Sequence, residues 1–103
     1  MIIFNDKCNF SGLVLLSFSA PWCSSCKIAH PTVLKLEQEF SEIKFYEVDI
    51  DDNEDLVQKF NIRTIPTFVI LNNDKEVKRF SGAIFITPFR KVLRDLIKEI
   101  KNG

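Results

Sequence analysis

Two cysteines separated by two residues, Cys23 and Cys26, are the side chains of this sequence best suited to chemistry. Thiols at this spacing can close into a disulfide and open again, which indicates redox activity. The preceding run, Leu13–Ser19, is apolar and strand-like, whereas Lys27–Phe40 has the period of an amphipathic helix. Cys23 therefore lies where a strand passes into a helix, and the unpaired N–H groups and dipole of the helix N-terminus stabilise its thiolate. We predict that the Cys23 sulfur is a nucleophile that ionises readily and is open to solvent.

The elements that must position the two cysteines alternate between strands and helices. Residues 2–4 predict a short edge strand, and the nearly continuous apolar side chains at 13–19 predict a strand buried on both faces. The remaining pattern predicts a strand at 43–50, a helix at 54–60, a hairpin of strands at 66–71 and 76–80, and a last helix that is capped by Thr87 and opened by Pro88. This order indicates an α/β fold: a central mixed β-sheet, with parallel strands plus a C-terminal antiparallel hairpin, flanked by helices. The cysteine pair then lies at the carboxyl end of a central strand, where open α/β sheets place their sites.

The bulk composition predicts a single globular domain, residues 1–103. Hydrophobic residues make up 46% of the chain and include ten phenylalanines, which predicts a packed core. Fourteen basic side chains balance fourteen acidic ones, so no net field favours nucleic acid or an anionic membrane as a partner. No apolar run reaches the roughly 18 residues that span a bilayer, and the first residues lack the pattern of a secretory signal. We therefore expect a cytoplasmic protein in which Cys8 is a free thiol.

Beyond the cysteine pair, five blocks of the sequence resemble the thioredoxin family. In the family's order, they are Phe18-Ser19-Ala20-Pro21-Trp22-Cys23-Ser24-Ser25-Cys26-Lys27, Pro31, Val48-Asp49-Ile50-Asp51, Ile62-Arg63-Thr64-Ile65-Pro66-Thr67 and Phe80-Ser81-Gly82-Ala83. The resemblance implies the thioredoxin fold and a thiol-disulfide oxidoreductase that reduces protein disulfides through Cys23 and Cys26. It also implies thioredoxin reductase as the electron donor, disulfide-containing proteins as substrates, a monomeric state, and no cofactor beyond the cysteine pair. The segment before the cysteines is shorter than the family norm, so we expect a turn at residues 5–11 in place of the usual first helix.

The resemblance also implies a substrate-binding surface around the cysteines. It implies a cis peptide bond between Ile65 and Pro66, which places the Ile65 backbone beside the Cys23 sulfur. There the backbone would pair with a substrate chain as with an added strand. The expected apolar docking surface comprises Trp22, Ile65, Pro66, Gly82 and Ala83. A simpler interpretation of Trp22, as a large aromatic side chain at the surface, remains open.

Further residues are expected to tune the thiols: Ser17, Ser24, Ser25, Lys27 and Glu47. Ser24 and Ser25 stand where thioredoxins usually carry Gly-Pro, and their hydroxyls can donate to a thiolate, which predicts a more oxidising pair. Ser17 stands where the family usually has a buried aspartate that is thought to help deprotonate the second cysteine. We expect this serine to fill a core position and to bond a backbone carbonyl. Removal of the Cys26 proton would then fall to a water molecule or to Glu47.

Alternative interpretations of the cysteines remain open. A raised redox potential would favour a disulfide isomerase or oxidant, and a thioredoxin-fold binding module would carry the pair without using it. Cys8, Cys23, Cys26 and His30 supply ligand types that suit zinc. We predict no metal site, because Cys8 lies in an unrelated turn and the resemblance implies that His30 faces the surface.

Overall fold

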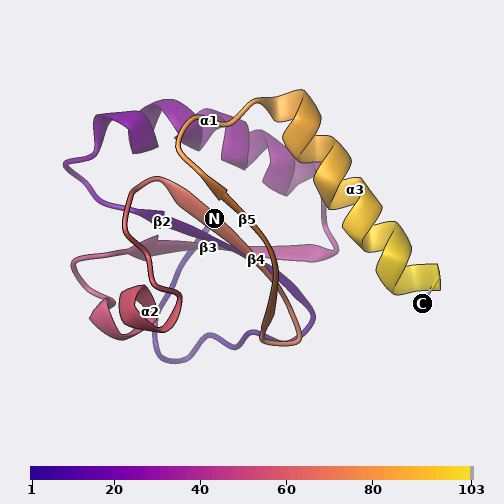
Figure 1. Ribbon diagram of the computed structural model, residues 1–103, viewed down its shortest axis with the longest axis horizontal. Coiled ribbons are helices and arrows are strands. Elements are labelled where there is room, and N and C mark those ends of the chain that lie inside the picture. The colour runs from indigo at the N-terminus through magenta and orange to yellow at the C-terminus, as the bar shows by residue number, and fades with distance from the viewer. Residues whose placement is uncertain (103) are drawn as a thin grey trace.

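The computed structural model describes residues 1–102, which form a five-stranded sheet with helices on both faces (Figure 1). In chain order the elements are β1 (Ile2–Ile3), β2 (Leu13–Ser19), α1 (Ser24–Glu39), β3 (Ile43–Asp49), α2 (Glu54–Lys59), β4 (Thr67–Asn72), β5 (Lys75–Ser81) and α3 (Ile86–Asn102). The predicted order of strands and helices is confirmed.

The strand that leads to the cysteines, β2, lies at the centre of the sheet, whose order is β1-β3-β2-β4-β5. It runs parallel to β3 along its whole length, from Leu13 opposite Ile43 to Ser19 opposite Asp49. On its other side it pairs antiparallel with β4, which turns back as β5. The predicted mixed sheet is therefore confirmed. Because β2 is hydrogen-bonded on both sides, the point where it ends is fixed.

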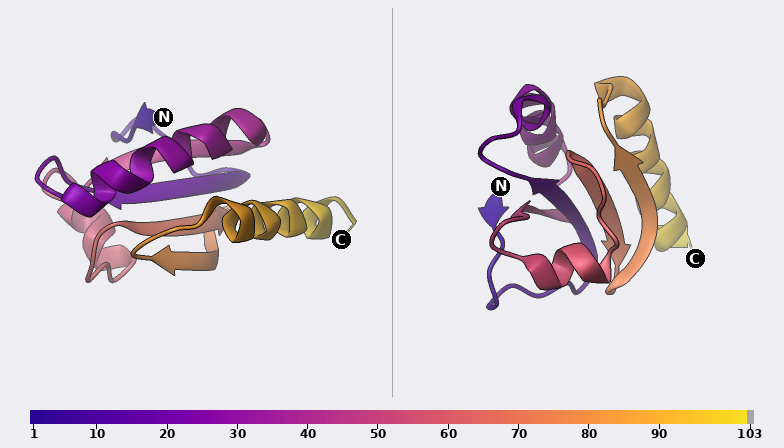
Figure 2. Two further views of the ribbon diagram at one scale, coloured as in Figure 1. Left: turned by 90° about the horizontal axis from the view of Figure 1, so that it is seen from above. Right: turned by 60° about the vertical axis from the view of Figure 1, so that its left-hand side comes forward.

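Alternate side chains of β2 enter two cores, one on each face of the sheet. Leu13 and Leu15 pack with α1 and α3, whereas Val14, Leu16 and Phe18 pack with side chains of α2 and the N-terminal segment. Figure 2 shows α1 and α3 together, away from α2. None of the residues from 13 to 18 is more than 9% exposed. A strand buried on both faces was predicted from the continuous apolar sequence, and it is confirmed.

The first helix, α1, begins at Ser24. The apolar period of the sequence had predicted a start at Lys27. Cys23 is its N-cap: the backbone there is extended, with φ −92° and ψ 108°, and the side chain accepts a hydrogen bond from the Cys26 N–H. Ser24 and Ser25 are exposed, so this first turn contributes no hydrophobic period that would reveal it. The start of the helix is set by its cap, and Pro31 lies inside the helix.

The last helix, α3, begins at Ile86, so the prediction that Thr87 caps it is wrong. The Phe89 N–H donates to the Phe85 C=O at 3.2 Å, which places the cap before Ile86. Pro88 does lie in the first turn, where helical N–H groups lack an intrahelical partner and the missing donor costs little. The predicted apolar stripe is confirmed, since Phe89 and Leu93 are buried in the core beneath the helix.

The residue that follows β5, Gly82, ties this edge of the sheet to the start of β4. Its N–H donates to the Pro66 C=O at 2.9 Å. Its φ of 81° lies in the left-handed region that favours glycine. The segment after β5 is therefore held beside Pro66 and cannot drift away from the end of the sheet where the cysteines lie.

The N-terminal segment is held by aromatic packing rather than by a helix. The ring of Phe10 lies 5.4 Å from that of Phe4 and 6.2 Å from that of Tyr46 on β3, measured between centroids. The Phe4 N–H donates to the Glu47 C=O at 2.8 Å. Residues 5–11 contain turns and irregular backbone, which confirms the expected loss of the usual first helix.

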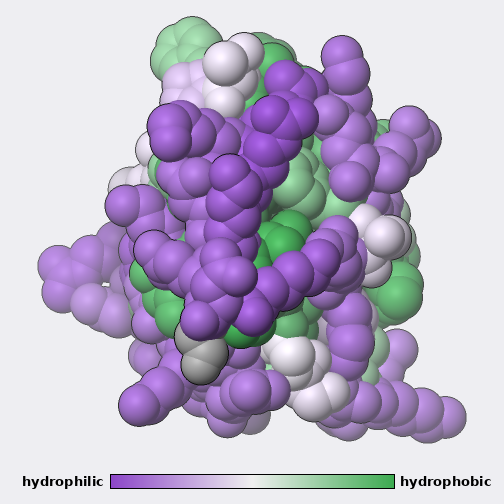
Figure 3. All heavy atoms as spheres, turned by 90° about the vertical axis from the view of Figure 1, so that its right-hand side faces the viewer, coloured by the Kyte–Doolittle hydropathy of each residue, from purple (hydrophilic) through white to green (hydrophobic). Residues whose placement is uncertain are grey.

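The outer side of α3 is polar. Figure 3 shows hydrophilic side chains over most of this face of the molecule, with hydrophobic ones visible in the gaps between them. Arg90 on α3 makes a two-pronged ion pair with Glu39 on α1, at 2.8 and 3.0 Å. The hydrogen-bonded guanidinium lowers the pKa of the Glu39 carboxyl. Within residues 1–102, no helix is both long and apolar enough to cross a bilayer.

A pair of matched phenylalanine substitutions tests this account of the core. Phe89 is 2% exposed and its ring lies 4.6 Å from that of Phe80 and 5.8 Å from that of Phe68, whereas Phe85 is 73% exposed. Phe89→Ala is expected to lower the free energy of unfolding by about 3–5 kcal/mol, because it leaves a cavity. Phe85→Ala is expected to change it by no more than about 0.5 kcal/mol. Urea denaturation measures both, and equal losses in the two variants would contradict the assigned packing.

Candidate active site

Cys23 and Cys26 form a disulfide at the junction between β2 and α1, with their Cα atoms 5.3 Å apart. The turn between strand and helix is closed by two backbone hydrogen bonds: the Cys23 N–H donates to the Ala20 C=O, and the Lys27 N–H donates to the Cys23 C=O. The Cys26 N–H donates to the Cys23 sulfur at 3.2 Å. A sulfur at this position faces the positive end of the helix dipole, which favours its thiolate form when the disulfide opens.

The disulfide is less exposed than the sequence led us to expect. Cys23 is 6% exposed and Cys26 is 8% exposed. Together with Ala20 they form a small apolar cluster, against which Ile50 and Ile65 pack. The apolar surroundings of the Cys23 sulfur therefore come from three separate segments of the chain: the cysteine turn, the residue after β3 and the residue before Pro66.

The two serines between the cysteines differ in their relation to the disulfide. The Ser25 hydroxyl lies 3.4 Å from the Cys23 sulfur, and either atom could be the donor. Within residues 1–102, no hydrogen bond joins the Ser24 hydroxyl to either cysteine. Of the two hydroxyls that the sequence offered, Ser25 is therefore the one placed to donate to a Cys23 thiolate.

The segments expected to bind substrate come together beside the cysteines. The Ile65–Pro66 peptide bond is cis, as the resemblance implied, and Ile65 packs against the disulfide cluster. Gly82 is hydrogen-bonded to Pro66, which places Ala83 at the same edge. Ala83 is exposed.

Trp22, immediately before the first cysteine, is 66% exposed. Its indole N–H donates to Asp51 Oδ2 at 2.9 Å, across the gap between the cysteine turn and the segment after β3. Sequence reasoning named the block that contains Asp51 but missed this contact, because no local pattern joins two residues so far apart in the chain. The bond holds a large exposed ring in a defined position beside the disulfide.

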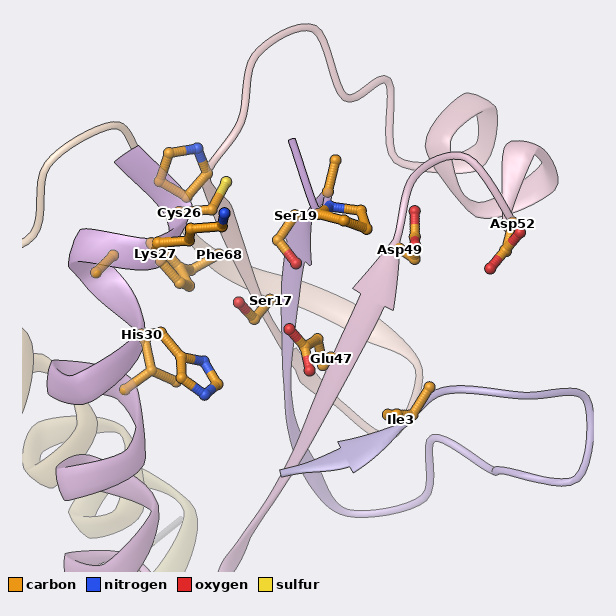
Figure 4. A pocket seen from close by; sticks show the side chains of 15 residues that line it. Ile3, Ser17, Ser19, Cys26, Lys27, His30, Glu47, Asp49, Asp52 and Phe68 are labelled. Atoms are coloured by element: carbon orange, nitrogen blue, oxygen red, sulfur yellow. The ribbon is translucent and has the colours of Figure 1, made fainter. Parts of the chain in front are cut away.

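Behind the disulfide lies a cavity of about 550 Å³. Cys26, Lys27 and His30 line it from α1, Ser17 from β2 and Glu47 from β3 (Figure 4). Ser17 and Glu47 are register partners on adjacent parallel strands, so they project to the same face of the sheet. The structure therefore brings together two of the residues that the sequence named as tuning the thiols.

Two residues of this cavity differ from expectation. No hydrogen bond joins the Ser17 hydroxyl to a backbone carbonyl within the described chain, so the expected bond is absent although the residue is only 6% exposed. His30 was expected at the surface, yet it is half-buried and lines the cavity, because it lies one helical turn after Cys26 on the same side of α1.

The four residues with zinc-ligand chemistry are not gathered around one point. Cys8 packs with Tyr46 and its neighbours on the opposite face of the sheet, and Cys23 and Cys26 are joined to one another. In the described part of the chain, no group of three or more His, Cys, Asp or Glu side chains is arranged to hold a metal ion. Cys8 is a free thiol, as predicted.

Comparison with known proteins agrees with this geometry. The family model named Thioredoxin matches residues 3–95. A thioredoxin H-type of Fagopyrum esculentum is 37% identical over 79 residues, which cover 76% of this chain and 68% of that protein. Thioredoxin of Ovis aries is 37% identical over 82 residues, which cover 78% of each.

Solved structures give the same result. The X-ray structure of Fasciola hepatica thioredoxin superposes with a TM-score of 0.74 at 38% identity, covering 82% of this chain and 80% of that one. Thioredoxin from Trypanosoma brucei brucei superposes with a TM-score of 0.75 at 35% identity, covering 84% and 76%. A disulfide at the end of a central strand is thus found in a chain that matches thioredoxins in both sequence and fold. The chain belongs to the thioredoxin family, and it is a thiol-disulfide oxidoreductase that reduces protein disulfides.

Proposed function

We propose that Cys23 attacks the disulfide of a protein substrate and that Cys26 resolves the mixed disulfide that results. The Cys23 thiolate bonds to one substrate sulfur, and the other substrate sulfur leaves with the electron pair. Cys26, as a thiolate, then attacks Cys23, closes the Cys23–Cys26 bond and releases the second substrate sulfur as a thiolate. The substrate gains two electrons and the cysteine pair loses them. The observation that supports this order is the hydrogen bond from the Cys26 N–H to the Cys23 sulfur, because it stabilises negative charge on Cys23.

The proposed docking surface consists of Trp22, Ile65, Pro66, Gly82 and Ala83. Within residues 1–102, no hydrogen bond occupies the backbone N–H or C=O of Ile65, and this residue packs beside the disulfide. An extended substrate segment could pair with these free groups as an added strand, which would bring its disulfide to Cys23. The exposed ring of Trp22 would cover the apolar part of such a segment.

The oxidised pair must recover two electrons before the next cycle, and we propose thioredoxin reductase as their donor. A monomeric protein in the cytoplasm is part of the same proposal. The free Cys8 thiol supports a reducing compartment, where thiols are not driven into disulfides.

A cysteine substitution tests the order of the two steps. Cys26→Ser, fully reduced and mixed with insulin, is expected to accumulate a covalent adduct through Cys23, because no second thiolate can release it. Mass spectrometry of the digested adduct identifies the linked cysteine. Cys8→Ser should turn over insulin as the unsubstituted protein does when coupled to a reductase, and Cys23→Ser should form no adduct. An adduct carried by Cys8, or by Cys26 in the Cys23→Ser variant at an equal rate, would contradict the proposal.

A charge placed on the docking surface tests the role of that surface. Ala83→Glu is expected to raise the KM for insulin about tenfold, which corresponds to about 1.4 kcal/mol, because docking would bury an unpaired carboxylate. The rate with a small chromogenic disulfide, which needs no docking surface, should stay within about twofold. Gln38→Glu adds the same charge near the other end of α1 and serves as the control. Equal effects of Ala83→Glu on the large and small disulfides would argue against docking at this edge.

The redox potential tests the role of Ser25. A hydroxyl that donates to the Cys23 thiolate stabilises the reduced form, so Ser25→Ala is expected to make the potential more negative by roughly 30 mV, equivalent to about 1.4 kcal/mol. Ser24→Ala should leave it nearly unchanged, and the Ser24→Gly, Ser25→Pro double variant should also be more reducing. Equilibration with glutathione measures each potential. A potential in Ser25→Ala at or above that of the unsubstituted protein would contradict the assignment.

The same contact supports a second candidate function. A dithiol whose reduced form is stabilised is a better oxidant, so a strongly raised potential would favour a disulfide isomerase or oxidant. Oxidation of reduced substrate proteins by the disulfide form would distinguish this role from reduction. The redox-inactive binding module has less support, since Cys23 and Cys26 are joined as a disulfide.

A further inference from the structure

The second step of the proposed mechanism requires that Cys26 lose a proton. A thiolate is the attacking species in disulfide exchange, whereas Cys26 lies past the start of α1, packed in an apolar cluster and 8% exposed. Burial in such surroundings disfavours the thiolate. A base that can be reached from Cys26 would therefore speed the release of substrate, and this inference rests on the proposed function.

Cys26 lines the cavity of about 550 Å³, which is large enough to admit water. Figure 4 shows the carboxylate of Glu47 and the ring of His30 facing one another across this space, with Ser17 pointing into it from β2. The other ionisable groups that line it are Lys27 on α1, Asp49 on β3 and Asp52 after β3. Each carboxylate and the imidazole is a candidate proton acceptor.

The hydrogen-bond pattern and the exposure of the side chains set Glu47 apart from the other two carboxylates, and the test below distinguishes it from His30. Asp49 Oδ1 already accepts from the Asp51 N–H at 2.9 Å, and Asp52 is exposed at the far side of the cavity. Within residues 1–102, no hydrogen bond or ion pair occupies the Glu47 carboxylate, which is half-buried. Glu47 is also the register partner of Ser17, whose hydroxyl is likewise unbonded within the described chain. A hydroxyl between water and a carboxylate can both donate and accept, so it can pass a proton along.

We propose that Glu47 accepts the proton of Cys26 through water in this cavity, with the Ser17 hydroxyl in the path. The Cys26 S–H bond breaks, its electron pair stays on sulfur, and the proton moves to the Glu47 carboxylate. The Cys26 thiolate then attacks Cys23, and the substrate sulfur leaves as a thiolate that takes a proton from Glu47 or solvent.

The test separates the two steps with one reagent, 5,5′-dithiobis(2-nitrobenzoate), mixed with the reduced full chain in a Cys8→Ser background. Attack by Cys23 releases one coloured thiolate, and attack by Cys26 releases the second. In Glu47→Gln, the second phase is expected to slow about tenfold at pH 7. This effect is smaller than the usual rate contribution of a general base, because water partly takes over as proton acceptor. The deficit should shrink as pH rises toward about 8.5, where solvent base deprotonates an ordinary thiol. The first phase should be unchanged.

Three further variants make the result decisive: a charge control, a rescue variant and His30→Gln. Glu99→Gln, which removes the same charge from an exposed position on α3, should leave both phases unchanged. Ser17→Asp in the Glu47→Gln background restores a carboxylate at the neighbouring register position on β2 and should recover the second phase. A second phase in Glu47→Gln that matches the unsubstituted protein from pH 6 to 8, an equal slowing of both phases, or a loss that follows His30→Gln instead would overturn the proposal.

Failure of the underlying function gives a different result. If the unsubstituted protein releases no first coloured thiolate through Cys23, the proposed function itself is wrong. If the first phase is normal and Glu47→Gln resolves at the normal rate, the assignment of Glu47 alone is wrong.

Discussion

The hydrogen bond from the Cys26 N–H to the Cys23 sulfur is the interaction on which the rest of the site depends. It caps α1 with the sulfur itself, so the same contact that begins the helix also sets the chemistry of the nucleophile. An ordinary cap would place a serine or aspartate oxygen here. With a sulfur in that place, reduction of the disulfide leaves an anion where the helix can stabilise one.

This junction is rigid because the strand before it is rigid. β2 is paired on both sides, and its side chains are buried in two cores that lie on opposite faces of the sheet. The strand pairing and the two cores thus hold the end of β2 in a fixed position. The residues around the cysteine turn come from other segments that are held to the same sheet: Pro66 before β4, Gly82 after β5, and Asp51 after β3.

The two sides of the disulfide have opposite character. On one side, the surroundings are apolar and include the exposed ring of Trp22 and the packed side chain of Ile65. Toward the cavity, the lining includes Ser17, His30 and Glu47, which can hold and move protons. Such a division suits a reaction in which one sulfur must meet a protein and the other must lose a proton. In this chain a serine stands where the family usually has an aspartate, and the carboxylates that line the cavity come from β3 and the segment after it.

The sequence by itself determined the redox pair, the order of the elements and the buried central strand, because these follow from local spacing and hydrophobic period. It also carried the cis Ile65–Pro66 bond, although only through family resemblance. Local pattern failed at the start of α1, whose first turn is polar, and at Thr87, which resembles a cap but follows the true one. Tertiary structure alone decided the small exposure of Cys23, the bond from Trp22 to Asp51, and the meeting of His30 with Glu47 across one cavity. Each of these features depends on residues from different elements. The distances between those residues are set by how the elements pack on one another, which no local sequence pattern specifies.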